Sequence, residues 1–181
     1  MTRIAAALAV LLLAGVLVFF AQAPAAQAAA GSFYAEYLRL RPSGIPGNDA
    51  IARLQPFISS RLNGLLRDGD EAELRYKRAT HGEVPPLVEG DVFTSLFEGA
   101  TVYAVRECEG DESQTVCPVS LTYRRRGEPE TTWTDSIALV REEGGWRVDD
   151  VIYGGDWPFA KRGRLTELLR SVVAESRKPV N

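Results

Sequence analysis

The stretch Glu130–Tyr153, ETTWTDSIALVREEGGWRVDDVIY, decides the fold. In its first half, Thr131–Val140, apolar side chains alternate with threonine, serine and alanine, which is the period of a half-buried β-strand. The second half, Trp146–Tyr153, keeps its apolar residues on one parity, and Glu143-Gly144-Gly145 supplies turn residues between the two halves. We therefore predict an antiparallel hairpin with one face towards the core. The predicted core face carries Trp133, Asp135, Ile137, Leu139, Trp146, Val148, Asp150 and Ile152.

The N-terminal residues predict export. Arg3 precedes an uncharged apolar run, Ile4–Phe20, and Ala-x-Ala sites follow at residues 21–23, 26–28 and 28–30. This pattern is typical of a signal peptide, and we expect cleavage after Ala28 or Ala30. Residues 1–30 would then be the signal peptide, and 31–181 a single periplasmic or secreted domain without a membrane attachment. The alternative is a retained N-terminal anchor, because the apolar run is long for a signal peptide.

Composition limits the function classes. About 150 residues after the signal suffice for one domain with its own core. The formal net charge is -3 and the arginines are dispersed, which argues against a nucleic-acid partner. The dense basic run, Arg124-Arg125-Arg126, precedes Gly127 and is typical of a solvated hairpin tip. Two thiols and one distant histidine are too few for a closed zinc site, and no cofactor-binding loop occurs, so we expect neither metal nor cofactor.

Helical periodicity precedes the strands. We expect a helix over 32–41, a second from Asn48 interrupted at Pro56, and a long third from Ser59 or Ser60 to about Arg78. Residues 81–99 have the composition of a linker, with one possible helical turn at 92–97. Strands at 101–108 and 116–125 precede the hairpin, and an amphipathic helix carrying Leu165 to Val173 ends the chain. This order is typical of an α+β domain with helices covering one face of a curved antiparallel sheet.

The two cysteines predict a disulfide. Export permits such a bond, and Cys108 and Cys117 lie at the facing ends of two adjacent predicted strands. Cysteines on paired strands meet the Cα separation that a disulfide requires. We therefore expect a Cys108–Cys117 bridge across the loop between them.

Three segments carry a family resemblance. Phe33–Leu38, Leu87–Ser95 and Gly144–Tyr153 resemble, in this order, the opening helix, central segment and closing strand of the domain-of-unknown-function family 3828. The closing strand is also similar to one that recurs in the nuclear transport factor 2-like superfamily. The resemblance implies a cone, in which a curved sheet wraps around N-terminal helices and leaves a pocket between them. It implies no activity, because that superfamily includes both enzymes and binding modules.

The predicted register suggests a candidate pocket. Pairing Arg126 with Glu130 sets Tyr123 opposite Trp133, and pairing Glu142 with Gly145 sets Ile137 opposite Asp150. Asp135 and Asp150 would then be diagonal neighbours on the apolar face, with Arg106 projecting from the same face. Together they would form the polar floor of a pocket, with Trp133 and Tyr123 beside it. The alternative is that Asp150 lies at the sheet margin and binds a loop backbone.

Three functions remain open. The first is a non-catalytic binding or interaction module of the bacterial cell envelope, which holds a small apolar ligand or an envelope protein. The second is an enzyme that uses a buried aspartate as general base. The third is a periplasmic inhibitor or immunity protein, recognised through the acidic loop Glu109–Thr115. An enclosed pocket favours the first two, and a flat exposed apolar patch favours the third.

Overall fold

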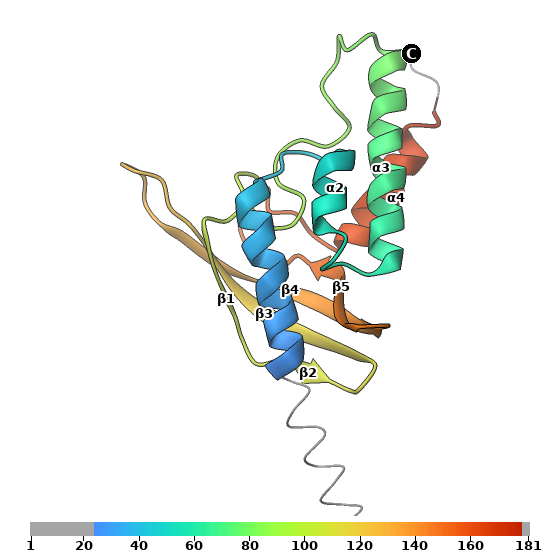
Figure 1. Ribbon diagram of the computed structural model, residues 1–181. Coiled ribbons are helices and arrows are strands. Elements are labelled where there is room, and N and C mark those ends of the chain that lie inside the picture. The colour runs from blue at the N-terminus through green and yellow to red at the C-terminus, as the bar shows by residue number, and fades with distance from the viewer. Residues whose placement is uncertain (1–23, 179–181) are drawn as a thin grey trace, which may run out of the picture.

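A computed structural model describes residues 24–178 as an α+β fold with an open, curved antiparallel sheet (Figure 1). A helix over residues 24–40 lies across the sheet, and three further helices gather beside it. The helices are 24–40, α2 (Asn48–Leu54), α3 (Ser60–Ala79) and α4 (Leu165–Glu175). The strands are β1 (Val102–Val105), β2 (Glu109–Gly110), β3 (Gln114–Tyr123), β4 (Thr131–Glu142) and β5 (Gly145–Ile152). Among the described helices, none has the length and hydropathy of a membrane span.

The sheet has the strand order β1-β3-β4-β5, with β2 paired to β3. The hairpin predicted at residues 130–153 is confirmed as β4 and β5, and Glu142 pairs with Gly145 as expected. The register between β3 and β4 differs from the prediction by two residues, since Leu121 rather than Tyr123 lies opposite Trp133. A shift of two preserves which side chains face the core, so the apolar pattern does not distinguish the two registers. The connecting loop is longer than predicted and carries the ion pair Arg124–Glu130.

A β-bulge changes the position of Asp150. Leu139 pairs with Val148 as predicted, but Ala138 then pairs with Asp150 because one extra residue, Asp149, enters β5 between them. The prediction that Asp150 faces Ile137 is therefore wrong. Beyond the bulge, Asp150 shares the face of Ala138, which is opposite to the face that carries Asp135. The Asp149 carboxylate accepts a hydrogen bond from Ser59 Oγ at 2.6 Å and pairs with Arg61 at the start of α3.

The helix over 24–40 packs its aromatic stripe on the core face of the sheet. It already includes residue 24 rather than starting at Ser32, so part of the segment assigned to the signal peptide lies in the described fold. Residues 1–23 lie outside the described part. The aromatic residues of the predicted stripe are buried. Phe33 and Tyr34 pack edge to face with centroids 5.3 Å apart, and Tyr37 packs in the same way on Phe93 of the 90–95 segment at 6.1 Å. Tyr103 of β1 stacks on Tyr34 at 5.4 Å. These rings therefore fill space between the helix and the sheet.

The long helix α3 is confirmed. Ser59 caps it, because its hydroxyl oxygen accepts a hydrogen bond from Leu62 N at 3.0 Å. Leu62 and Leu66 are fully buried, whereas Leu65 is only partly buried. The helix continues past Gly64 and Gly69 to Ala79, as its apolar periodicity predicts, and packs against α4.

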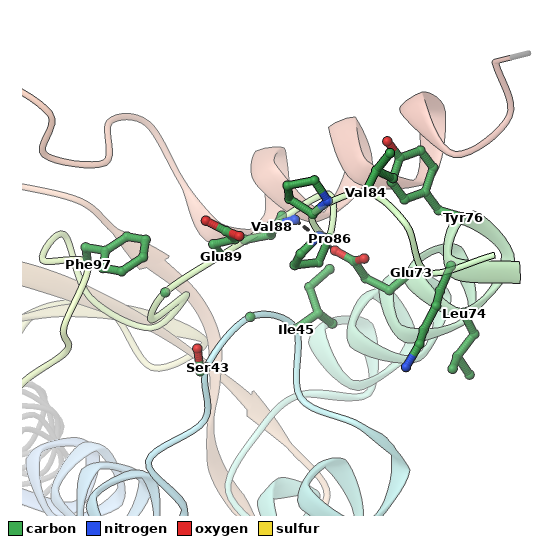
Figure 2. A pocket seen from close by; sticks show the side chains of 15 residues that line it. Ser43, Ile45, Glu73, Leu74, Tyr76, Val84, Pro86, Val88, Glu89 and Phe97 are labelled. Carbon is green, nitrogen blue, oxygen red and sulfur yellow. Dashed lines mark hydrogen bonds between the residues drawn. The ribbon is translucent and has the colours of Figure 1, made fainter. Parts of the chain in front are cut away.

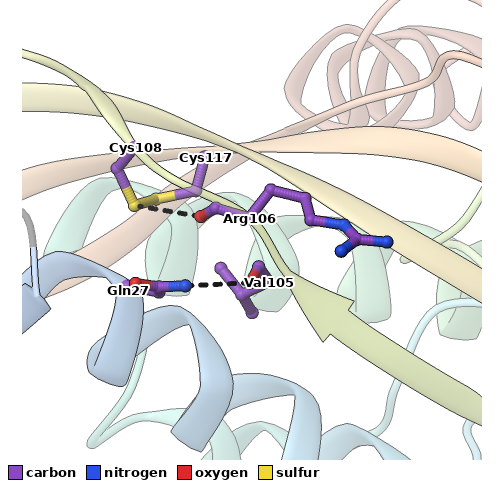
Figure 3. The surroundings of a disulfide bond; sticks show 5 residues. All are labelled: Gln27, Val105, Arg106, Cys108 and Cys117. Atoms are coloured by element: carbon purple, nitrogen blue, oxygen red, sulfur yellow. Dashed lines mark hydrogen bonds between the residues drawn. A yellow bond between two sulfur atoms is a disulfide. The ribbon is translucent and has the colours of Figure 1, made fainter.

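The predicted disulfide is confirmed, and the predicted helical turn at residues 92–97 is wrong. The bridge between Cys108 and Cys117 is present, with a Cα–Cα distance of 4.1 Å, and β2 begins directly after it (Figure 3). The predicted helical turn at 92–97 is absent, because these residues form bends. Residues 90–95 are nevertheless buried rather than solvated as a linker would be. They lie beneath the sheet and bring Asp91 and Ser95 into the interior.

Candidate functional site

Asp135 is a buried structural acceptor. Only 1% of its surface is exposed, and four donors point at its two carboxylate oxygens. Ser95 N and Trp133 Nε1 donate to Oδ2 at 2.8 and 3.0 Å, and Gly154 N and Ser95 Oγ donate to Oδ1. The carboxylate therefore ties β4 to the buried 90–95 segment and to the chain that follows β5. Its lone pairs are directed at these neutral donors rather than at an open cavity.

Asp150 holds the start of α4. It accepts hydrogen bonds from Thr166 N at 3.1 Å and from Thr166 Oγ1 at 2.9 Å, and Arg164 lies 3.5 Å from it. An acceptor on the first amides of a helix stabilises that helix, because these amides have no partner within it. The structure is therefore close to the alternative, since Asp150 binds backbone beside the edge strand β5, but that backbone belongs to the start of α4 rather than to a loop.

The other three residues of the predicted pocket are Arg106, Tyr123 and Trp133, and they do not connect Asp135 with Asp150. Arg106 is exposed, and its Nε donates to Ser120 Oγ at 3.0 Å on the sheet face opposite to Asp135. Tyr123 is half-buried at the end of β3. Trp133 is buried, bonds Asp135 and packs against the ring of Trp157 at 5.9 Å. The structure thus brings Trp133 and Asp135 together and places Asp150 and Arg106 on the opposite face, while Tyr123 stays on the face of Trp133 as its diagonal neighbour.

An apolar groove of about 670 Å³ lies between the C-terminal half of α3 and the 82–90 loop (Figure 2). Three large apolar side chains in its walls are exposed to solvent: Leu74 by 43%, Val84 by 42% and Phe97 by 55%. Figure 2 shows Phe97 at one end, with Leu74 and Tyr76 at the other. Its other lining includes Ile45, Pro85, Pro86 and Val88, with Lys77 and Glu89 as charged groups.

Glu73 fixes the loop that forms the far wall of the groove. Its two carboxylate oxygens accept hydrogen bonds from Leu87 N at 3.1 Å and Val88 N at 2.8 Å. A carboxylate that accepts two backbone amides holds a loop against a helix without help from a ligand. The adjoining 43–45 segment is held as well, because Gly44 N donates to Gly90 O at 2.6 Å. The groove is therefore formed in the free protein, which lowers the ordering cost of binding.

The Phe97 end of the groove depends on a glycine. Gly90 has φ +72°, and a Cβ at this position would lie 2.5 Å from the Phe97 ring. Only glycine adopts this conformation readily and also leaves room for the ring. On its other side the ring is approached by Lys161, whose Nζ lies 5.8 Å from the centroid, a cation–π geometry. Burial lowers the pKa of Lys161.

Asp91 is a second buried carboxyl group. Burial raises the pKa of Asp91 to about 6, although Tyr37, Phe93 N and Lys161 oppose the shift. Phe93 N donates to its carboxylate at 2.7 Å. Asp91 and Tyr37 line a cavity of about 50 Å³ whose other walls include Arg41 and Glu98. A space of this size holds one or two water molecules and excludes most metabolites.

The sequence pattern predicted neither the groove nor the Asp91 cavity. The groove and Asp91 depend on residues 82–99, whose glycines and prolines read as a solvated linker. The available signal was the cluster of apolar residues in that stretch, Val84, Leu87, Val88, Val92, Phe93 and Phe97, which is dense for a linker. Comparisons with protein families, with curated proteins and with solved structures find no match for this chain.

Proposed function

We propose that this protein is a non-catalytic binding module of the bacterial cell envelope, which holds a small apolar ligand in the groove along α3. The observation that carries the proposal is the gathering of Leu74, Val84 and Phe97 in the walls of one preformed hollow. Exposed apolar side chains scattered singly need no explanation, whereas a group that lines one groove marks a binding site. The volume of about 670 Å³ lies in the range of small-molecule sites.

The ligand we propose is mainly apolar with a single polar or charged end. Most of the lining is carbon, from leucine, valine, isoleucine, proline and phenylalanine side chains. Lys77 and Glu89 are its outward charged groups, while Glu73 is occupied by backbone amides. Two charges of opposite sign orient a polar end without selecting strongly for its charge.

An enzyme that uses a buried aspartate is the second candidate, and Asp91 is the residue that favours it. Its raised pKa suits a general base. Its cavity of about 50 Å³ is more than tenfold smaller than the groove and is lined by a different set of residues. Because a substrate must reach the base, we place this candidate below the binding module.

Family and location complete the proposal. The three resembling segments occupy the helix over 24–40, the buried 90–95 region and β5, and the open sheet with helices on its core face is consistent with a nuclear transport factor 2-like cone. We propose membership of family 3828 on this basis. We also propose an exported location, which the Arg3–Phe20 sequence and the Cys108–Cys117 bridge support.

The test is a fluorescence titration with 1-anilinonaphthalene-8-sulfonate, an apolar dye with one charge. We expect saturable binding to the native protein and at least tenfold weaker binding to Leu74→Asp and Val84→Asp. The matched control is Val102→Asp on β1, where the valine is 40% exposed outside the groove. Thermal unfolding of each variant confirms that it is folded. Equal loss in all three variants, or no loss in any, would contradict the proposal.

A further inference from the structure

Residues 24–31 are built into the fold. Ala26 and Ala30 are 1% and 0% exposed and belong to the main core. Between them, Gln27 Nε2 donates a hydrogen bond to Val105 O of β1 at 2.9 Å (Figure 3). One turn later, Tyr103 Oη donates to Gly31 O at 2.9 Å. This part of the helix therefore makes two hydrogen bonds to the edge strand β1 and contributes two buried alanines to the core.

Cleavage at the Ala-x-Ala sites 26–28 and 28–30 would remove contacts of this segment. A cut after Ala28 deletes Ala26 and Gln27, and a cut after Ala30 deletes the other buried alanine as well. The cut after Ala30 would also put a charged amino group at Gly31, two residues before the fully buried Phe33. A charge in such surroundings is unfavourable without a partner.

The upstream sequence is long enough to span a bilayer. Ile4–Phe20 is apolar throughout, and the chain carries no charge from Ile4 to Ala35. A signal peptide has an apolar region of about 7–15 residues, whereas a membrane span needs roughly 17–25. Arg3 supplies a positive charge on the side that stays in the cytoplasm. The two remaining Ala-x-Ala sites, residues 21–23 and 23–25, are followed by Pro24 or contain it, and the proline ring restricts the backbone beside each scissile bond.

We propose that the N-terminal apolar segment is retained and anchors the domain in the lipid bilayer, with the helix over 24–40 as the stem. The stem enters the domain beside β2, at the end remote from the C-terminal half of α3 (Figure 1). The groove along α3 is then held away from the bilayer surface, where it is open to soluble molecules. This proposal does not depend on what the groove binds.

The experiment is expression of the full chain in a bacterium, followed by membrane separation, an alkaline carbonate wash and intact mass spectrometry. We expect protein in the washed membranes with a mass that includes Arg3, while a periplasmic marker of the same cells is soluble and fully processed. A soluble product that begins at residue 24 or 26 overturns the anchor. A product that begins at residue 29 or 31 overturns both the anchor and the structural role of the 24–30 segment.

A pair of variants tests the stem separately. Ala30 is buried and Ala25 is exposed, so Ala30→Leu forces extra volume into the core and Ala25→Leu does not. We expect Ala30→Leu to lower the Tm of the detergent-extracted protein by about 3–10 °C, and Ala25→Leu to leave it within 1–2 °C, roughly the scale for a domain of this size. Equal Tm values for the two variants would contradict the proposal, because they would mean that this segment does not pack against the core.

Discussion

Replacing Asp135 tests how the interior is held together. In Asp135→Ala, four donors lose their acceptor, but two of them have a substitute. The Ser95 hydroxyl can rotate, and Gly154 N already lies 3.1 Å from Ser95 Oγ. For Ser95 N and Trp133 Nε1 the carboxylate is the acceptor that the fold supplies. At about 1–3 kcal/mol for each unsatisfied donor, we expect a loss of about 2–6 kcal/mol.

The matched substitution Asp135→Asn keeps one carbonyl oxygen for Ser95 N and Trp133 Nε1. It should therefore cost less, about 1–2 kcal/mol. Asp156→Ala, at an exposed position of the following loop, is the control and should stay within about 0.5 kcal/mol. The assay is urea unfolding monitored by tryptophan fluorescence and circular dichroism. An Asp135→Ala protein as stable as the wild type, or an Asn variant as unstable as the Ala variant, would refute the reasoning from donor count.

The remaining predictions concern stability and pH. Leu62→Ala should cost about 2–5 kcal/mol and the half-buried Leu65→Ala clearly less, with equal urea midpoints contradicting the assigned buried face of α3. Replacing both Cys108 and Cys117 by alanine should cost about 2–3 kcal/mol, and two free thiols in the exported protein would contradict the bridge. Asp91 has a pKa of about 6 in the fold against an unfolded value near 3.8, so its protonated form is favoured in the folded state. The stabilisation that Asp91 adds to the free energy of unfolding is therefore fully present below the unfolded pKa and is lost as the pH rises through 6. The unfolding free energy of the wild type relative to Asp91→Asn should therefore fall by about 2–3 kcal/mol between pH 4 and pH 7, and parallel pH profiles would contradict this assignment.

The period-two pattern predicted β4 and β5 because each strand exposes one face to the core. Parity alone does not determine a shift of two, and the Tyr123–Trp133 pairing was wrong for that reason. At the bulge, the Asp149 carboxylate binds Ser59 and Arg61, which lie about 90 residues earlier. The sequence around Asp149 therefore does not predict the bulge. As a consequence, Asp150 lies on the opposite face of the sheet and does not join Asp135 in the predicted pocket.

The candidate groove was not predicted because the composition of residues 82–99 is that of a linker. Glycine and proline in residues 82–99 read as a flexible linker, yet Gly90 serves the packing of Phe97, and Glu73 of α3 fixes the loop through its amides. These contacts join segments that are remote in sequence, so a reading of local patterns does not reveal them. The disulfide was predictable because Cys117 lies on β3 and Cys108, nine residues earlier, directly precedes β2, which pairs with β3.

Native mass spectrometry of protein purified from a bacterial envelope tests the central claim most directly, because it detects a bound molecule and counts subunits together. We predict that the wild type carries a small apolar molecule in one-to-one ratio, that Leu74→Asp loses it, and that Val102→Asp keeps it. A wild-type protein that carries no adduct and takes up none from an envelope lipid extract, or an adduct that persists unchanged in Leu74→Asp, would contradict the assignment of the groove as the binding site.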